Sequence, residues 1–555
     1  MIKRSIILFA VLFSFSSMQS QSFRIEDIPD MFGKGKELKL NGSVSANSSW
    51  NMGEGAEGRD PWAYFLNGNL NLNILGLVDV PISFNLTNSG SSYKLPTSPN
   101  RLSITPSYKN LTAHIGDVSM SFSPYTMNGH IFTGGGLDWT PGDWEFSAMY
   151  GRLLKAVEYD TLQPFILPTY QRMAYGTKAG RKAEKYQVSV NMFNAWDNAS
   201  SLVIPPDSLG ITPMKNLAGG VSLKFNPIKM IEISGEYGLS LLTHDKRTEK
   251  AATSSYNAFK AQVNLLGKNN SIGVGYERID PGYRTLGAYY FVNDLENITL
   301  NAAQSFWQGN INLNVSIGYE HDDLAKNRAN VSSRMVGSAN ISAKLSERVN
   351  TNLSYSNFQS FSNVRSNFEL INQENPLDLL DTLNFVQLSQ NANLNLSIIT
   401  KKSDKRQDNL NLNFSYQDAA SKHGETYQPG SVSEMLNGSA AYSLNFLQSE
   451  LMLNGALNMN NSRIQNANAF TWGPTVECGF KLFKKKVNMR TSVSYNTGLL
   501  DGIKQNEVFL CRLNSSYTLL KKHNITGAYS FQRRSTITRS PVNYSLLTIG
   551  YNYSF

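Results

Sequence analysis

The sequence predicts an all-β protein, a single transmembrane antiparallel up-and-down β-barrel of about 26 strands (about 24–26). Three observations predict this fold. Apolar and polar residues alternate along many segments, tight connections alternate with long ones, and the chain ends inside an alternating segment. We expect residues 37–555 to form the barrel, with long loops outside the cell and no N-terminal plug domain.

The alternation is clearest in Leu66–Ile74, where aliphatic residues or glycine occupy the even positions and asparagines the odd ones. Successive side chains of a strand point to opposite faces of the sheet. One face of each strand is therefore apolar and suited to lipid, and the other is a ladder of amides suited to water. The asparagines that we expect to line the lumen are Asn67, Asn69, Asn71, Asn73, Asn312, Asn314, Asn391, Asn393 and Asn395.

A soluble β-sandwich also alternates, so segment length and connections decide between the two folds. The alternating segments run for about 10–14 residues, whereas soluble strands average about 5–6 and a tilted membrane strand needs about 9–11. Short periplasmic turns and long outside loops are typical of outer-membrane barrels. Short connections include Gly267–Asn270 and Lys484–Lys486, and long ones include Leu153–Thr169, Asn194–Asn216, Phe358–Thr382 and Asp418–Ser431.

The last segment resembles the C-terminal signal that the barrel-assembly machinery reads. Its outward-facing residues are expected to be Leu547, Ile549, Tyr551, Tyr553 and Phe555. The alternative is an ordinary edge strand with an aromatic end, which would leave a long edge open to aggregation. Closure of this segment against the first strand, expected near Leu38–Trp50, removes that edge.

The first residues are typical of a secretory signal peptide. Lys3 and Arg4 precede a short apolar stretch, and small and polar residues follow it. We expect a signal peptide over residues 1–20, cleaved after Ser20 or Ser22, and a short periplasmic lead over residues 23–36. The expected location is the outer membrane of a Gram-negative cell.

The net charge is +9, and the positive residues are dispersed and recur at expected turns such as Lys484–Lys486. A nucleic-acid-binding protein would cluster this charge on one face, so we expect no nucleic-acid partner. Lysines at turns lie near lipid head groups, where they favour anionic lipid. The expected partners are outer-membrane lipids, lipopolysaccharide and the assembly machinery, with a periplasmic or surface protein as a further expectation.

Residues suited to chemistry are scarce. Cys478 and Cys511 lie in expected strands separated by another strand, which favours two unpaired thiols. No histidines have the spacing of metal ligands. His244 next to Asp245, and His321 next to Asp322, would suit a surface protease that activates water, but such pairs are also common in solvated loops. We expect no enzyme activity, no cofactor and no metal.

Two of the expected loops are unusually apolar. About 26 strands enclose a cylinder on the order of 50 Å across, and an open hole of that width would admit proteins and antibiotics. Apolar side chains in a loop usually pack against something. We therefore expect these loops to constrict the lumen, with an external lid or surface patch as the alternative. The candidate residues are Phe165, Ile166, Leu167, Phe368, Leu370 and Ile371.

The segment Ser123–Gly136 is the most distinctive in the chain. No Lys-Ser/Thr follows its three final glycines, which excludes a Walker phosphate loop. The glycines instead favour a bulge or a close approach inside the barrel. Three short Asp-Ser/Thr-Leu matches resemble O-glycosylation sites, although chance also produces so short a pattern: Asp160–Leu162, Asp207–Leu209 and Asp381–Leu383.

The stretch from Arg101 to about Ser201 resembles large, uncharacterised outer-membrane β-barrel proteins of Bacteroidota. The resemblance implies a fold and a location, and it implies no activity or substrate. It is carried by Ser123-Pro-Tyr-Thr, the Gly134–Gly136 run, Tyr150-Gly-Arg152 and Phe193–Asn198.

The expected function is a transport or translocation channel for solutes or a larger cargo, gated by loops or by a partner. Neutral amides bind sugars and peptides by hydrogen bonds without strong selection for charge. The alternatives are a non-conducting scaffold or component of a surface secretion or attachment apparatus and, third, an outer-membrane protease or lipase.

Overall fold

The computed structural model describes residues 38–555, except for short segments. The segments outside the described residues are 57–59, 90–95, 97–98, 161–166, 249–251, 323, 326–332, 359, 363–367, 369–370, 373–385, 424–425 and 465–466. The expected signal peptide and periplasmic lead also lie outside them, so these two expectations stay predictions. No helix of the described residues is long and apolar enough to cross a membrane.

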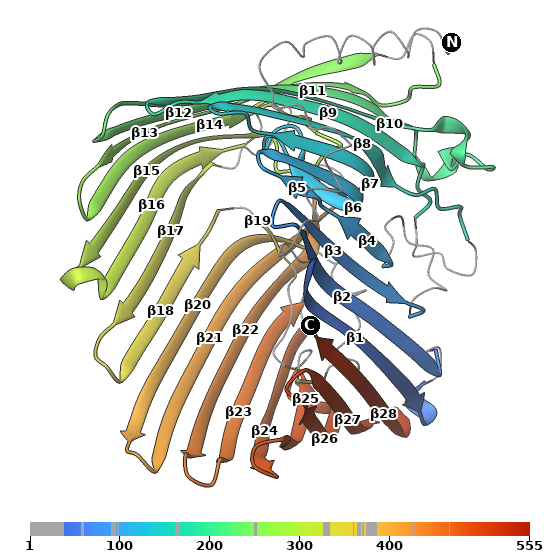
Figure 1. The fold of residues 1–555 in the computed structure, drawn as a ribbon, viewed down its shortest axis with the longest axis vertical. Helices are drawn as coiled ribbons and strands as arrows, with labels where there is room; N and C mark the ends of the chain where they lie inside the picture. The colour runs from blue at the N-terminus through green and yellow to red at the C-terminus, as the bar shows by residue number, and fades with distance from the viewer. Residues whose placement is uncertain are drawn as a thin grey trace.

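The strands form one closed antiparallel barrel (Figure 1). Its wall has 26 strands, because β4 and β5 together form one strand between β3 and β6, and β18 and β19 both pair with β20. The expected antiparallel barrel of about 26 strands is therefore confirmed, whereas the expected absence of an N-terminal plug domain stays a prediction. Apart from the strands, the described residues contain four 3-10 turns, η2 (Glu54–Ala56), η3 (Ala199–Ser201), η4 (Asp207–Leu209) and η5 (Trp307–Gly309).

The strands have the following bounds: β1 Lys39–Met52, β2 Trp62–Ile74, β3 Val78–Thr87, β4 Arg101–Ile104, β5 Ser107–Tyr108, β6 Leu111–Ser121, β7 Asn128–Trp139, β8 Trp144–Leu154, β9 Arg172–Lys182, β10 Tyr186–Asp197, β11 Lys215–Ile228, β12 Ile231–Thr243, β13 Thr253–Leu266, β14 Asn270–Ile279, β15 Leu295–Phe306, β16 Ile311–His321, β17 Ser333–Lys344, β18 Val349–Ser356, β19 Ser360–Ser362, β20 Val386–Lys402, β21 Arg406–His423, β22 Thr426–Phe446, β23 Leu451–Ile464, β24 Ala467–Leu482, β25 Val487–Leu500, β26 Ile503–Leu519, β27 His523–Thr536 and β28 Arg539–Ser554.

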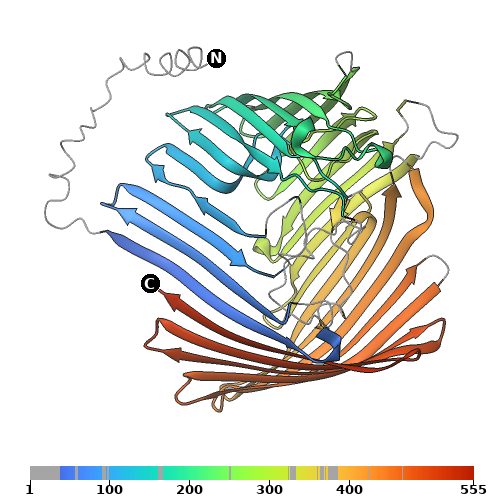
Figure 2. The same ribbon diagram turned by 90° about the vertical axis from the view of Figure 1, so that its right-hand side faces the viewer.

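The last strand closes the barrel against the first, as the alternating C-terminal segment predicts. β28 pairs with β1 in an unbroken register from Ser43↔Ser554 to Met52↔Ser545. The amide of Phe555 then donates to the carbonyl oxygen of Gly42 at 2.9 Å. β1 and β28 lie side by side in both ribbon views (Figure 2). Closure satisfies backbone groups that a sheet edge would expose, which a membrane does not tolerate.

The two rims of the barrel differ in the length of their connections. One rim, here called the turn rim, carries short turns such as Leu75–Leu77 and residues 483–486. The other, the loop rim, carries longer connections over much of the chain, including residues 155–171, 198–214 and 280–294. The expected long loop Asp418–Ser431 is wrong, because β21 and β22 continue through it and residues 424–425 alone connect them.

The apolar face of the strands points outward. In β15 the side chains of Ile298 and Leu300 are 56% and 49% exposed, and they alternate with the polar side chains of Asn297, Thr299 and Asn301. Large aliphatic side chains that are exposed in regular alternation are what a strand presents to lipid.

The two cysteines are free thiols. Cys478 lies on β24 and Cys511 lies on β26, and β25 separates them.

A charge at the centre of the outward face is expected to destabilise the barrel. Leu300→Arg should lower the free energy of unfolding by roughly 2–4 kcal/mol, because the guanidinium would lie in the hydrocarbon of the bilayer. Urea titration of the barrel in lipid vesicles measures this change. The control Asn301→Arg, one residue further along the same strand, should cost less than about 1 kcal/mol. Equal losses in the two variants would contradict the orientation of β15.

Candidate functional site

Two loops of the loop rim fold back onto the polar, lumenal face of the wall. They are residues 122–127, between β6 and β7, and residues 283–287, between β14 and β15, and we call them the paired lumenal loops. Met127 and Gly287 form a parallel bridge, and the amide of Asn128 donates to the carbonyl oxygen of Gly287 at 3.0 Å. The hydroxyl of Tyr283 donates to the carbonyl oxygen of Tyr125 at 2.7 Å. The two loops therefore form one unit.

Polar side chains of the wall hold this unit in place. Thr126 Oγ1 donates to Asn191 Oδ1 on β10 at 2.6 Å. Asn216 Oδ1 on β11 accepts from the amide of Leu286 at 3.2 Å. Ser240 Oγ on β12 donates to the carbonyl oxygen of Arg284 at 2.6 Å. All three wall residues are buried, so each bond satisfies a polar group that would otherwise cost about 1–3 kcal/mol.

The lumenal position of this unit follows from strand alternation. Asn191 lies between Val190 and Met192, whose side chains are 55% and 40% exposed on the outward face. Neighbouring side chains of a strand point to opposite faces, so Asn191 and the loops bonded to it lie on the inner side of the wall. The paired lumenal loops consequently occupy part of the lumen beside β10, β11 and β12.

Glycines of the wall make room for the loop side chains. A Cβ at Gly176 would lie 2.5 Å from Cε2 of Phe122, and one at Gly238 would lie 2.6 Å from the Cβ of Tyr125. A Cβ at Gly136 would meet the sulfur of Met120. The sequence predicted a bulge or close approach at Gly134–Gly136, and the contact at Gly136 is of that kind. The loop residues Phe122, Met127 and Leu286 belong to one buried apolar cluster.

Burial determines the protonation of the paired lumenal loops. It raises the pKa of the Tyr125 hydroxyl and that of Tyr283 far above the ordinary value, and the carboxylate of Glu277 adds to the shift at Tyr125. Burial also lowers the pKa of the Arg284 guanidinium. Both tyrosines therefore keep their protons at physiological pH, and the Tyr125 hydroxyl donates a hydrogen bond to Glu277 Oε1 at 2.7 Å.

A third segment reaches the wall far from its own strands. Asn372 belongs to the connection between β19 and β20, residues 363–385, yet it bonds to β25 and β27. Asn496 Nδ2 donates to Asn372 Oδ1 at 3.0 Å, and Gln532 Nε2 donates to the carbonyl oxygen of Asn372 at 3.3 Å. Asn496 and Gln532 are almost fully buried, as is Phe368. Asn372 therefore lies against strands that are five and seven places beyond β20 along the wall.

The expected constricting residues fall into three groups. Phe165, Ile166 and Leu370 lie outside the described residues. Phe368 is buried and Ile371 is half-buried in the segment that contacts β25 and β27. Leu167 is exposed. A constriction by the first apolar loop therefore stays a prediction.

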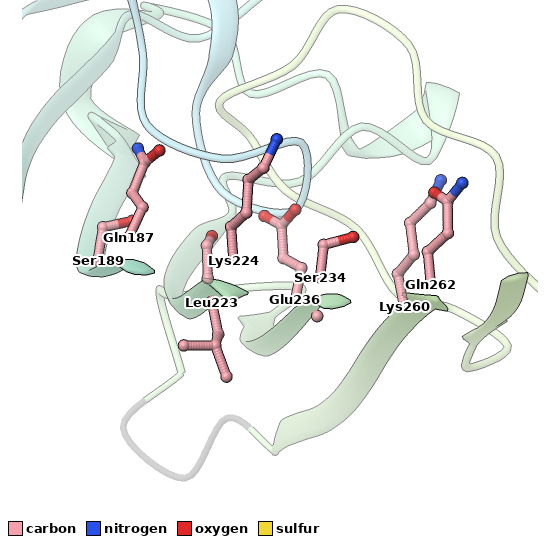
Figure 3. Close-up of a pocket in the computed structure, with 10 residues that line it drawn as sticks. Gln187, Ser189, Leu223, Lys224, Ser234, Glu236, Lys260 and Gln262 are labelled. Carbon is pink, nitrogen blue, oxygen red and sulfur yellow. The ribbon is translucent and has the colours of Figure 1, made fainter. Parts of the chain in front are cut away.

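A polar hollow of about 330 Å³ lies on the lumenal face of β10–β13, next to the paired lumenal loops (Figure 3). The polar side chains that line it project from the strands on one side, whereas the Leu223 side chain points the opposite way. Its polar lining residues are Gln187, Ser189, Ser222, Lys224, Ser234, Glu236, Lys260 and Gln262.

The charges in and around the hollow are paired. Lys224 Nζ lies 2.7 Å from Glu232 Oε2, and Lys260 Nζ lies 3.3 Å from Glu277 Oε2. Glu236 accepts a hydrogen bond from Ser123 of the paired lumenal loops. The hollow therefore presents amides and hydroxyls beside charges that largely compensate one another.

The expected amide ladder lies on regular strands. Asn71 is paired with Asn41 on β1 and with Pro81 on β3. Asn393 donates to Asn391 Oδ1 at 2.9 Å along the same face of β20. Contact of these nine asparagines with a solute stays a prediction, as does reading of the C-terminal residues by an assembly machinery. Tyr551 Oη lies 2.7 Å from His523 Nδ1 on β27.

The acid–histidine pairs that the sequence suggested have other partners. Asp245 accepts from the Arg247 guanidinium, which lowers the pKa of that carboxyl and also bridges to Asp207 in the neighbouring loop. His321 Nε2 lies 3.4 Å from Glu296 Oε2 on β15. In the part of the chain that the structure describes, no cluster of three His, Cys, Asp or Glu residues could hold a metal ion.

Sequence reasoning missed the second of the paired lumenal loops. Residues 280–294 were not distinguished from other connections, although they contain the aromatic run Tyr289-Tyr290-Phe291 and, before it, Tyr283. Such a density of aromatic residues in a loop indicates packing, because these side chains bury large areas.

Sequence reasoning also missed a contact between His114 on β6 and Asp138 on β7. His114 Nε2 lies 2.7 Å from Asp138 Oδ2.

Comparison with known proteins identifies no family for this chain. No protein-family model matches the chain, and no curated protein matches it. Among solved structures, the FrpB iron transporter from Neisseria meningitidis is 9% identical, with 95% of this chain and 84% of that chain covered and a TM-score of 0.37. The copper transporter OprC is 10% identical, with 94% and 81% covered and a TM-score of 0.40. The P pilus usher (PapC) translocation pore is 11% identical, with 93% and 99% covered and a TM-score of 0.34.

A side chain at Gly238 is expected to displace the paired lumenal loops. Gly238→Val would place atoms against Tyr125 and against the Tyr283 hydroxyl, 2.6 and 2.8 Å from the new Cβ. Such overpacking costs about 1–3 kcal/mol, and displacement would expose the Tyr283–Arg284–Thr285 backbone. We expect at least about tenfold faster trypsin cleavage after Arg284, measured by mass spectrometry of the fragments.

The matched control is Gly235→Val on the same strand. The nearest atom to a Cβ at Gly235 is the Lys260 carbonyl oxygen at 3.7 Å, an ordinary contact. Its cleavage rate should equal that of the wild type. Equally fast cleavage in both variants would show that the close contact at Gly238 does not hold the paired lumenal loops in place.

Proposed function

We propose that this protein is an outer-membrane channel whose lumen is narrowed by its own loops. The observation that carries the proposal is the seating of the paired lumenal loops on buried wall residues, directly beside the polar hollow of β10–β13. A wall of 26 strands encloses far more space than a small solute needs. Loops bonded to the inner wall reduce that space to polar passages.

The residues that line the polar hollow support a preference for polar solutes of low net charge. Amides and hydroxyls of the hollow can donate and accept hydrogen bonds, and the paired lysines and glutamates leave little net field for selecting ions. Sugars and short peptides fit this chemistry better than simple ions. The cargo named for the iron and copper transporters belongs to those proteins.

The outer membrane is the membrane that suits the chain. An antiparallel barrel with an apolar outer face and a polar lumen is the form that outer-membrane proteins take, and the first residues are typical of a secretory signal. In this orientation the turn rim faces the periplasm and the loop rim faces outside. A relationship to Bacteroidota barrel proteins rests on residues 101–201 and stays a prediction, as does O-glycosylation.

A second candidate function is a non-conducting scaffold of a surface apparatus. The observation that favours it is the completeness of the loop seating, since buried hydrogen bonds from three strands hold the paired lumenal loops in the lumen. Planar-bilayer recording separates the two candidates. Conductance steps that soluble sugars or peptides reduce would support the channel, and silence would support the scaffold.

Release of Asn372 from the wall is expected to raise conductance. The double variant Asn496→Leu/Gln532→Leu removes both side chains that bond to Asn372. The segment then loses its anchors on β25 and β27, and we expect larger and noisier single-channel steps than in the wild type. Planar-bilayer recording at fixed salt measures them.

The control for this variant is Asn460→Leu, which removes a buried lumenal amide that bonds to Asn437 on the neighbouring strand. Its steps should match the wild type. An unchanged conductance in the double variant would argue against a role of residues 368–372 in narrowing the lumen.

A further inference from the structure

The polar hollow of β10–β13 carries its side chains in two rows that cross the four strands. Directly paired residues of neighbouring strands share a face, and Leu223, next to Lys224, is 46% exposed on the outward side. Both rows therefore face the lumen, and each offers a charged or hydrogen-bonding group at every position. The rows are Gln187↔Lys224↔Ser234↔Gln262 and Ser189↔Ser222↔Glu236↔Lys260.

The charges of the hollow alternate in sign. The Glu236 carboxylate lies between the side chains of Lys224 and Lys260 (Figure 3). Glu236 is paired directly with Lys260 and lies diagonally from Lys224, and such positions are about 4.5–5.5 Å and about 7–8 Å apart. It accepts a hydrogen bond from Ser123, which leaves other lone pairs of the carboxylate for a solute. A solute in the hollow therefore meets opposite charges a few ångströms apart.

The two ammonium groups stay accessible although each has a carboxylate partner. The side chains of Lys224 and Lys260 are 49% and 51% exposed, whereas those of their partners Glu232 and Glu277 are 21% and 22% exposed. An ammonium has three N–H donors. Each lysine can therefore bind the carboxylate of a solute and keep its partner on the wall.

The lining disfavours a solute that depends on apolar contacts. None of the ten lining residues, all of which lie in the described part of the chain, is aromatic, and Leu223 points away from the others. The C–H face of a sugar ring binds best against an apolar or aromatic surface, which small-molecule sites usually supply. A peptide instead needs partners for its amide groups and for its two charged ends. The hollow supplies both kinds of partner.

We propose that the polar hollow binds short zwitterionic peptides. The amino terminus of the peptide lies at Glu236, its carboxyl terminus lies at Lys224 or Lys260, and Gln187 and Gln262 bond to its amide groups. Two or three extended residues span at most about 7–11 Å, which is comparable with the diagonal separation of the charges. This inference deepens the channel proposal and rests on it, because it names the solute of the same hollow.

The test measures binding of triglycine to the full-length folded protein in detergent by isothermal titration calorimetry. N-acetyl-triglycine amide keeps the triglycine backbone without its charged ends, and it should bind at least about tenfold more weakly. Maltose should also bind more weakly than triglycine. These comparisons use the wild-type protein, so they need no variant to fold. The double variant Lys224→Gln/Lys260→Gln should lower the affinity for triglycine at least about tenfold.

The matched control is Arg490→Gln on β25. Arg490 lies on the lumenal side of this strand, opposite to the exposed Val493 and Tyr495, and far along the wall from the hollow. Its pair with Glu477 has similar exposure, 52% and 22%. The affinity of this variant for triglycine should stay within about twofold of the wild type. Equal affinities for triglycine and its capped form, tighter binding of maltose, or equal losses in the two variants would overturn the proposal.

Planar-bilayer recording separates this inference from the channel proposal. A silent protein that still prefers triglycine to its capped form would contradict the channel and support the peptide site. A conducting protein that binds the two peptides equally would contradict the peptide site and support the channel.

Discussion

The requirement that every backbone amide and carbonyl be paired inside a membrane governs this structure. Hydrocarbon offers no hydrogen-bond partners, so a sheet that spans it must close. Closure depends on the register between β1 and β28, which runs without a bulge from Ser43 to Met52. The remaining features are consequences of a closed wall: outward apolar residues, an enclosed polar surface, and connections confined to two rims.

A closed wall of this size encloses an interior that the side chains of its strands are too small to fill. The paired lumenal loops fill part of it with a small apolar core that rests on glycines of the wall, such as Gly176 and Gly238. Their backbone groups cannot all reach water, and buried wall residues such as Asn216 supply the missing partners. The same stretch of β10–β13 carries the open polar hollow beside this core. The wall residues that hold the paired lumenal loops and the polar hollow therefore lie on one side of the barrel.

The strands of the wall also differ in the length over which they pair with their neighbours. Long strands such as β20–β22 pair over most of their length, whereas β4 and β5 are short and interrupted at Thr105 and Pro106. Proline has no amide hydrogen to donate to a neighbouring strand. Across this interruption, β3 pairs with both β4 and β5. Variation in strand length therefore gives different sectors of one barrel different surroundings.

The two-residue periodicity by itself determined the barrel, because it is a local property that each strand carries in its own residues, as Leu66–Ile74 does. Clear alternation also predicted the closing strand. It did not reveal that β21 and β22 extend through residues 418–431, where the alternation weakens and pairing with neighbours prolongs the strands. The interior was decided by tertiary structure alone. Whether Tyr283 meets Tyr125, and whether Leu286 meets Asn216, depends on segments far apart in sequence, and no local pattern encodes such contacts.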